Sequence, residues 1–210
     1  VTLRKNANAL ARERAATWRG YEWAGVGIGD RQGRFWGVPH RNKGSFEANL
    51  IDFFSNRKRI SAFNLTEESL EKYHRMLLKF QPKYLYGYVS VLEVFANYIR
   101  DNNLGLIPSL VSIITTSEVL NPIARGTISS AFGVRVFNEY GCGELGSIAH
   151  ECRHGSMHLM SDNLIVETLS GEATGELVAT DLFNYAQPII RYRLGDFATL
   201  SDDLCDCGVS

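Results

Sequence analysis

Three cysteines and one histidine in the last third of the chain have the residue types and the spacing of a metal site. Five residues separate Cys152 from His158, and one residue separates Cys205 from Cys207. Three thiolates and an imidazole form a ligand set that Zn²⁺ accepts in tetrahedral geometry, and four protein ligands leave no open position for water. The pattern therefore indicates a structural zinc site.

The spacing leaves two alternatives open. His154 competes with His158 for the imidazole position, and a disulfide is the alternative to a metal. Four cysteines are too few for a small disulfide scaffold, and two cysteines only two positions apart are more typical of metal sites than of structural bridges. We therefore take the cysteines as reduced, with Cys142 as the one outside the metal set.

Three polar segments follow apolar, strand-like runs. They are residues 115–118, 138–144 and 191–196. In open α/β sheets, ligands bind beyond the carboxyl ends of the strands, which is where such segments lie. The second segment offers an aromatic face for a base, glycines that let backbone approach phosphate, and a carboxylate for Mg²⁺. A glycine-rich turn with an edge tyrosine and a solvated glutamate explains the same residues, and chemistry alone leaves that alternative open.

The elements that would position these segments alternate in type. Helical and strand-like patterns follow one another from residue 66 to residue 137, which predicts an α/β fold with a largely parallel sheet flanked by helices. The elements expected are a helix over 66–80 capped by Thr66, a strand over 84–88, a helix capped by Ser90, a strand over 110–115, a helix over 121–131 and a strand over 134–137.

Beyond Cys152 the pattern changes to short strands separated by turn residues. The expected strands are 157–159, 163–168, 176–180, 188–192 and 197–200, so the C-terminal quarter is β-rich. We expect two parts, an α/β core over residues 1–150 and a β-rich subdomain with the zinc site over residues 151–210.

Composition narrows the class of protein. The chain has 210 residues, with 22 Lys and Arg against 23 Asp and Glu, for a net charge of −1. Without a basic excess, nucleic acids and anionic membranes are poor candidates as partners. No apolar run approaches the roughly 20 residues that span a bilayer, and the N-terminus has no signal-peptide core. We therefore expect a cytoplasmic protein. The oligomeric state stays open, a homodimer included.

The order and spacing of three segments resemble one known family. Residues 138–152 (NEYGCGELGSIAHEC), 175–180 (GELVAT) and 188–196 (PIIRYRLGD) are similar to motifs of the adenylate-forming superfamily, in its phenylacetate-CoA ligase and CapK-like branch. The resemblance covers essentially the whole chain. It implies part of the N-terminal domain of an enzyme that adenylates a carboxylic acid with ATP and passes the acyl group to a thiol such as coenzyme A.

The resemblance also implies roles for individual residues. Tyr140 would stack on adenine, Asn138 would meet the adenine amino group, and Gly141 belongs to the same loop. Glu144 would hold Mg²⁺ and serve as the catalytic carboxylate, and Asp196 would bind the ribose hydroxyls. The remaining positions are Ser117 and Glu118, which would line the adenine and acyl pocket. In the family, a histidine follows the E-C pair at a similar distance and a C-x-C-G follows the ribose motif, which favours His158 over His154.

The sequence departs from the family pattern at three places. Gly143 replaces a Ser or Thr whose hydroxyl would help to hold the α-phosphate, residues 116–117 replace two small residues, and Leu194 replaces a Thr. The family's phosphate loop would end just before Val1, and the C-terminal domain with its catalytic lysine would follow Ser210. We therefore expect an internal fragment of a longer ligase, inactive by itself.

Two alternatives to a coenzyme A ligase remain. The first is a non-catalytic, zinc-stapled homologue that binds nucleotide without turnover. The second is an adenylating enzyme of polysaccharide or cofactor biosynthesis that uses an acceptor other than coenzyme A.

Overall fold

The computed structural model describes residues 2–37 and 45–208, which fall into two compact units. Residues 24–138 form the α/β unit, and residues 1–23 together with 139–210 form the β-rich unit. The expected domain division at residue 150 remains a prediction. Among the helices of the described ranges, none has both the length and the apolar character that a membrane crossing requires.

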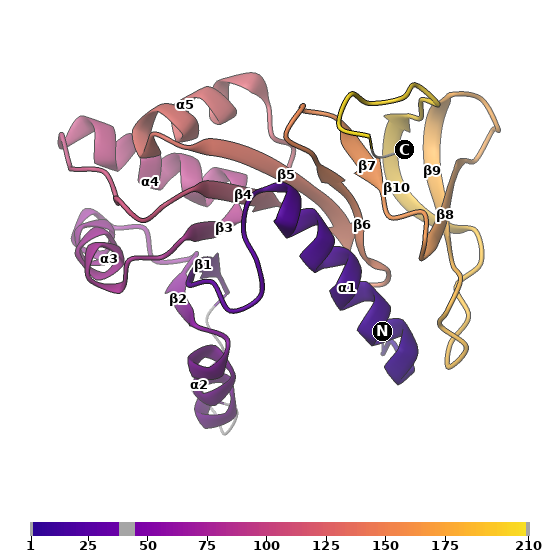
Figure 1. Cartoon of the computed structure of the whole chain (residues 1–210), viewed down its shortest axis with the longest axis horizontal. Helices are drawn as coiled ribbons and strands as arrows, with labels where there is room; N and C mark the ends of the chain where they lie inside the picture. Colours follow the sequence, from indigo (N-terminus) through magenta and orange to yellow (C-terminus); the bar gives the residue numbers. More distant parts are fainter. Residues whose placement is uncertain (1, 38–44, 209–210) are drawn as a thin grey trace. The chain divides into compact units, whose positions relative to one another are not determined.

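The α/β unit contains a sheet in the order β2-β1-β3-β4-β5, as Figure 1 shows. The pairs β1–β2, β1–β3 and β3–β4 are parallel, as the alternating pattern predicted. Its elements are β1 (Gln32–Trp36), α2 (Ser45–Phe54), β2 (Arg57–Ser61), α3 (Glu67–Phe80), β3 (Tyr84–Tyr88), α4 (Val89–Asp101), β4 (Ser112–Thr116), α5 (Pro122–Phe132) and the first half of β5 (Arg135–Cys142).

Two helices of this unit begin where the sequence predicts. The Thr66 side chain accepts a hydrogen bond from the Ser69 amide, and α3 follows. Asn121 accepts from the Ala124 amide ahead of α5, whose first residue is Pro122. These residues satisfy amide groups that have no partner within the helix. The prediction for α4 was wrong by two residues, because the helix begins at Val89 and its N-cap residue is Tyr88, which forms no side-chain cap.

The core of the α/β unit lies between the sheet and its helices. Strand side chains form one buried cluster with side chains of α3, α4 and α5, and β3 and β4 are buried along almost their whole length. Phe35, Leu85, Ile113 and Val136 each contribute from a different strand. This packing fixes the strand ends from which residues 115–118 and Asn138 project.

In its described residues, 2–23 and 139–208, the β-rich unit consists of one helix and antiparallel strands. The second half of β5 pairs with β6, which pairs with β7, and a separate sheet has the order β10-β9-β8, as seen in Figure 1. The elements are α1 (Ala7–Trp23), β6 (Gly146–Glu151), β7 (Met157–Leu159), β8 (Leu164–Thr168), β9 (Thr174–Asp181) and β10 (Tyr192–Thr199).

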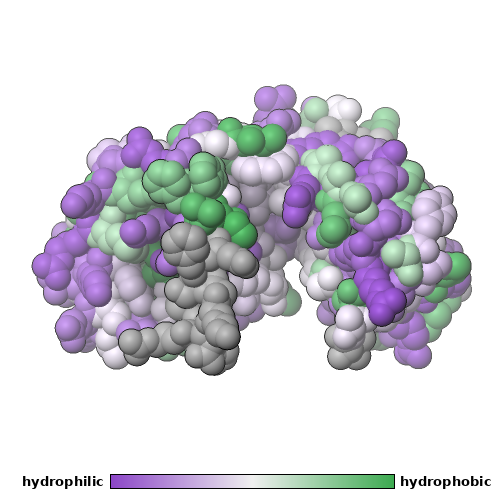
Figure 2. Space-filling model, turned by 90° about the horizontal axis from the view of Figure 1, so that it is seen from below, coloured by the Kyte–Doolittle hydropathy of each residue, from purple (hydrophilic) through white to green (hydrophobic). Residues whose placement is uncertain are grey.

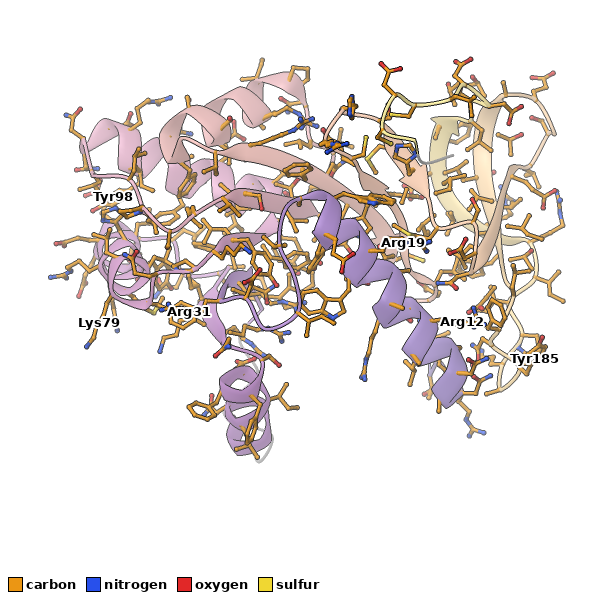
Figure 3. All side chains as sticks on the ribbon, in the orientation of Figure 1. Arg12, Arg19, Arg31, Lys79, Tyr98 and Tyr185 are labelled. Carbon is orange, nitrogen blue, oxygen red and sulfur yellow. The ribbon has the colours of Figure 1, made fainter. Side chains whose placement is uncertain are left out.

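Polar contacts fix α1 within its own unit. Arg12 and Arg19, labelled in Figure 3, extend from this helix. The Arg12 guanidinium lies 3.6 Å from the centre of the Phe183 ring, a favourable cation–π geometry, and Arg19 forms an ion pair with Asp162.

In Figure 2, hydrophobic residues lie in small patches among hydrophilic ones.

A buried histidine anchors β6 beneath α1. His150 is 2% exposed, its ring lies edge-on to Tyr21, and a Cβ at Gly20 would come within 2.2 Å of the ring. Only glycine therefore fits at position 20. The Ser147 hydroxyl lies 2.6 Å from His150 Nε2, and Glu139 lies opposite His150 in the β5–β6 pairing. Burial lowers the pKa of His150 to about 4, so the ring is neutral at pH 7.

Candidate active site and metal centre

Tyr140 and Asp196 form the centre of the candidate nucleotide site in the β-rich unit. The half-buried Tyr140 side chain extends from β5, and its hydroxyl donates a 2.8 Å hydrogen bond to Asp196 Oδ2. Burial first, and then the bond to Asp196, raise the pKa of Tyr140 above its ordinary value. The phenol therefore keeps its proton and donates it to the carboxylate.

A bulge in β10 presents Asp196. Arg193 pairs with Val178 and Phe197 pairs with Glu176, so three residues of β10 lie opposite one residue of β9. Gly195 within the bulge has φ +81°, a conformation that glycine adopts without strain. The sequence predicted a strand over 188–192 followed by a turn, which was wrong: the strand begins at Tyr192 and Asp196 lies inside it. Bulges re-aim side chains in this way.

Glu144 lies in the turn between β5 and β6. Its Oε1 accepts a 3.2 Å hydrogen bond from the Tyr192 hydroxyl. The pKa of Glu144 lies below its ordinary value, chiefly because its own backbone amide donates to the carboxylate, with smaller contributions that include Tyr192 and the charge of Lys5. Glu144 thus presents an anionic, partly exposed carboxylate, the kind of oxygen donor that a hard cation such as Mg²⁺ binds.

Two glycines of this segment have different surroundings. A Cβ at Gly141 would lie 2.3 Å from the Gly146 carbonyl oxygen, whereas a Cβ at Gly143 would meet nothing within 4 Å. Gly141 is thus required by the close pairing of β5 with β6, and Gly143 is not required by packing. Between them, burial raises the pKa of the Cys142 thiol. The sequence placed residues 138–142 in a loop, but β5 continues through Cys142.

A hollow of about 310 Å³ adjoins Glu144. Its lining is apolar apart from Glu144, a glutamine amide and a tyrosine hydroxyl, which is the usual character of a small-molecule site. The lining residues are Leu3, Glu144, Gln187, Pro188, Ile189, Ile190 and Tyr192.

The α/β unit holds the other residues expected at the site. Ser117 has φ +66°, a strained value for a residue with a side chain. Glu118 accepts hydrogen bonds from the Ser90 amide at 2.6 Å and from the Ser90 hydroxyl at 2.8 Å, so this carboxylate binds the N-terminus of α4. The Thr115 hydroxyl donates to the Phe137 carbonyl, beside Asn138. Both segments thus follow neighbouring strands of one sheet.

The structure brings together the four proposed metal ligands, all in the β-rich unit. The ligand atoms of Cys152, His158, Cys205 and Cys207 lie within 4.8 Å of one another. The Sγ atoms of Cys152 and Cys205 are 3.7 Å apart, and Cys207 Sγ is 3.2 Å from His158 Nε2. Thiolates about 2.3 Å from Zn²⁺ at tetrahedral angles are separated by about 3.8 Å, so the set fits this ion. All four cysteines are free, and a disulfide would require about 2.05 Å between sulfurs.

Two similar turns present the thiols. The Gly155 amide donates to the Cys152 carbonyl at 3.0 Å, and the Gly208 amide donates to the Cys205 carbonyl at 3.1 Å. Both glycines have positive φ. The His154 amide donates to Cys152 Sγ at 3.3 Å, which helps to orient this sulfur toward the other three ligand atoms.

The remaining ligands fit the same site. Hydrogen bonds lower the pKa of Cys205 to about 6, the largest contribution coming from the Ser156 side chain. His158 is buried and its ring lies edge-on to Trp23, whereas the His154 side chain is exposed. The geometry therefore favours His158, as the resemblance did.

Sequence reasoning missed Tyr192. Its hydroxyl holds Glu144 while Asp196, four residues later, holds Tyr140. No local signal pointed to Tyr192, because the register of β10 shifts between Arg193 and Phe197 and the regular alternation of side chains does not continue through such a bulge.

No protein-family profile matches the chain. Curated relatives do match. Protein CapK of Staphylococcus aureus is 32% identical over 151 residues, which cover 71% of this chain and 33% of CapK. The phenylacetate-coenzyme A ligase of Thermus thermophilus is 27% identical over 154 residues, which cover 66% of this chain and 34% of the ligase. The chain is thus a relative of CapK and of phenylacetate-coenzyme A ligase, the branch of the adenylate-forming superfamily that its motifs resemble.

Solved structures support the same fold. A crystal structure of 2-hydroxyisobutyryl-CoA ligase in complex with 2-HIB-AMP and CoA aligns with 97% of this chain and 50% of the ligase chain, at a TM-score of 0.75 and 20% identity. The chain spans about a third of the length of the curated relatives it matches.

Proposed function

We propose that this chain contributes the nucleotide-binding part of a ligase that adenylates a carboxylic acid, of aryl or similar type, with ATP and transfers the acyl group to coenzyme A. The observation that carries the proposal is the hydrogen bond from Tyr140 to Asp196 in the same unit as the anionic Glu144. In this proposal, the Tyr140 ring would stack on the adenine of ATP, the Asp196 carboxylate would bind its ribose, and the Glu144 carboxylate would bind the Mg²⁺ that accompanies its phosphates.

In the proposed reaction, the substrate carboxylate attacks the α-phosphorus of ATP and pyrophosphate leaves with the bonding electron pair. A thiolate then attacks the acyl carbon of the resulting acyl-adenylate, and AMP leaves. The protein acts mainly by positioning, which can lower a barrier by several kcal/mol. The proposal is for a cytoplasmic enzyme, consistent with four free cysteines.

Each residue of the site has a defined task. Tyr140 stacks on adenine while its hydroxyl orients Asp196, whose carboxylate accepts from the ribose hydroxyls. Glu144 would hold Mg²⁺, which when bound offsets charge on the phosphoryl oxygens. Gly141 allows backbone to approach the phosphate. Asn138 would bind the adenine amino group.

Two further assignments complete the proposal. Ser117 and Glu118 would line the adenine and acyl pocket. Cys152, His158, Cys205 and Cys207 would hold a structural Zn²⁺ that joins residues 152–158 to the end of the chain. Four protein ligands fill the tetrahedral positions, so this ion takes no part in the reaction.

ATP–pyrophosphate exchange tests the proposal. The full-length protein is offered aryl, fatty and amino acids in turn, beside Glu144→Ala and Asp196→Ala variants. We expect exchange that depends on one class of acid and falls by about 10²-fold in Glu144→Ala, equivalent to about 2.7 kcal/mol of transition-state stabilisation. ATP binding without exchange for any acid would instead favour a non-catalytic homologue. Product analysis with coenzyme A or amines identifies the acceptor.

A further inference from the structure

Lys5 is a basic residue held beside the turn that carries Glu144. Its ammonium forms an ion pair with Glu13 at 2.6 Å, and only 12% of the lysine side chain is exposed. The Glu13 side chain in turn packs on Gly146, where a Cβ would lie 2.3 Å from Glu13 Cγ and Cδ. The Lys5–Glu13 pair therefore packs against the β5–β6 turn through Glu13. The contact is at Gly146, two residues after Glu144 in the sequence.

The backbone on both sides of Lys5 is fixed. The Arg4 amide donates to Gln187 Oε1 at 3.0 Å, and the Asn184 side chain donates to the Arg4 carbonyl at 3.0 Å. On the other side, the Asn6 side chain donates to the Phe183 carbonyl at 2.9 Å. These bonds reduce the freedom of the segment that carries Lys5, so its ammonium is placed before any ligand binds.

Lys5 retains capacity to bind an anion. An ammonium has three N–H donors, and in the described part of the chain Glu13 is the partner that Lys5 contacts. The positive charge of Lys5 is also one of the contributions that lower the pKa of Glu144. At the nucleoside end of the site, the hydrogen bond joins Tyr140 to Asp196 and does not involve Lys5. A compact ammonium with spare donors is a common ligand of phosphate.

We propose that Lys5 binds the phosphate chain of ATP next to Glu144 and that Glu13 is its positioning residue. This inference rests on the proposed function, because it takes ATP as the ligand and Glu144 as the metal-binding carboxylate. In this inference, Lys5, which lies in the segment before α1, would add a protein contact to the phosphates of ATP.

Binding measurements separate this role from a structural one. ATP, pyrophosphate and adenosine are each titrated, with Mg²⁺, into the full-length protein and its Lys5→Met, Lys5→Arg and Arg14→Met variants. Arg14 is the matched control, because it is an exposed basic residue on α1. A charge-assisted hydrogen bond corresponds to a change of about 10-fold to 100-fold in affinity. We expect that loss for ATP and pyrophosphate in Lys5→Met, with adenosine unchanged, partial recovery in Lys5→Arg and no change in Arg14→Met.

The outcomes distinguish this proposal from the proposed function. Equal weakening of ATP and adenosine in Lys5→Met would show that Lys5 only supports the fold, and unchanged ATP and pyrophosphate binding would show that it does not contact phosphate. Either result overturns the inference while leaving the proposed function intact. Failure of the unmodified protein to bind ATP would overturn both.

Discussion

The Tyr140 hydroxyl donates a 2.8 Å hydrogen bond to Asp196, a residue 56 positions away in the sequence. This bond joins β5 to the bulge of β10, so it holds the ring that would stack on adenine beside the carboxylate that would bind ribose. The strand elements of a single unit bring them together. The binding of a nucleoside then requires little further ordering of the protein.

Replacing Tyr140 separates the two functions of its side chain. Tyr140→Phe keeps the ring and loses the hydrogen bond to Asp196, which should weaken ATP binding about 10-fold. Tyr140→Ala also loses the stacking, which is worth about 1–3 kcal/mol for a base on an aromatic ring, and should weaken binding by a further 10-fold or more. Calorimetric titration with ATP measures both. Equal affinities for the Phe and Ala variants would contradict the stacking role.

Gly143 and Gly141 offer a matched pair of substitutions. Gly143→Ser should leave the melting temperature unchanged, because its Cβ meets no atom within 4 Å, and its hydroxyl should strengthen ATP binding by about 5-fold through one added hydrogen bond. Gly141→Ser should destabilise the protein, since its Cβ would lie 2.3 Å from the Gly146 carbonyl oxygen. Thermal melting and ATP titration test both. A fold destabilised by Gly143→Ser would refute the geometry of this turn.

Ser117→Gly should stabilise the α/β unit. Ser117 has φ +66°, and relief of a left-handed conformation is worth about 1 kcal/mol. Ser130→Gly is the control, because Ser130 is an exposed residue within α5 and glycine there should cost about 0.5 kcal/mol. Urea unfolding measures the free energy of both variants. A loss of stability in Ser117→Gly would show that the backbone at residue 117 is not left-handed.

The first two-thirds of the chain were easier to predict than the last third, for physical reasons. Helices α3 and α5 carry their own start signals in Thr66 and Asn121, and such caps act locally. The bulge that places Asp196 depends on the pairing of β10 with β9. That pairing is a long-range property, which local residue patterns do not encode.

The same distinction applies to the site. The donor set of the metal cluster follows from residue types, so Cys152, Cys205 and Cys207 could be named from spacing. The hydrogen bonds of Tyr192 and Ser90 were not foreseen, because each joins segments that come together only in the folded chain. Ser90 was predicted to cap α4 and instead binds Glu118.

Stability should depend on pH through His150. Burial lowers the pKa of His150 from 6.5 to about 4 in the folded protein. Between these pH values the unfolded chain binds a proton that the folded protein excludes, so stability is full above pH 6.5 and falls by about 3 kcal/mol as the pH drops to about 4. Chemical denaturation at pH 7 and pH 5, compared with His150→Gln, isolates this contribution. An identical pH dependence in the variant would exclude His150 as its source.

Metal content and its removal test the Cys–His cluster. The purified protein should contain about one Zn²⁺ per chain, and Cys207→Ser should lose the metal together with about 3 kcal/mol or more of stability. Cys142→Ser should retain both, because Cys142 lies outside the cluster. Elemental analysis and melting with a chelator provide the measurements. A zinc-free protein whose melting temperature does not respond to zinc or chelator would refute the assignment.

The most direct test of the account is the binding of ATP to the full-length protein with and without Mg²⁺. The account predicts that Asp196→Ala weakens ATP binding about 10-fold or more under both conditions, because it removes the ribose contact. Glu144→Ala should abolish the Mg²⁺-dependent gain in affinity and leave binding without Mg²⁺ unchanged. Wild-type affinity and Mg²⁺ dependence in both variants would contradict the claim that Tyr140, Glu144 and Asp196 form a nucleotide site.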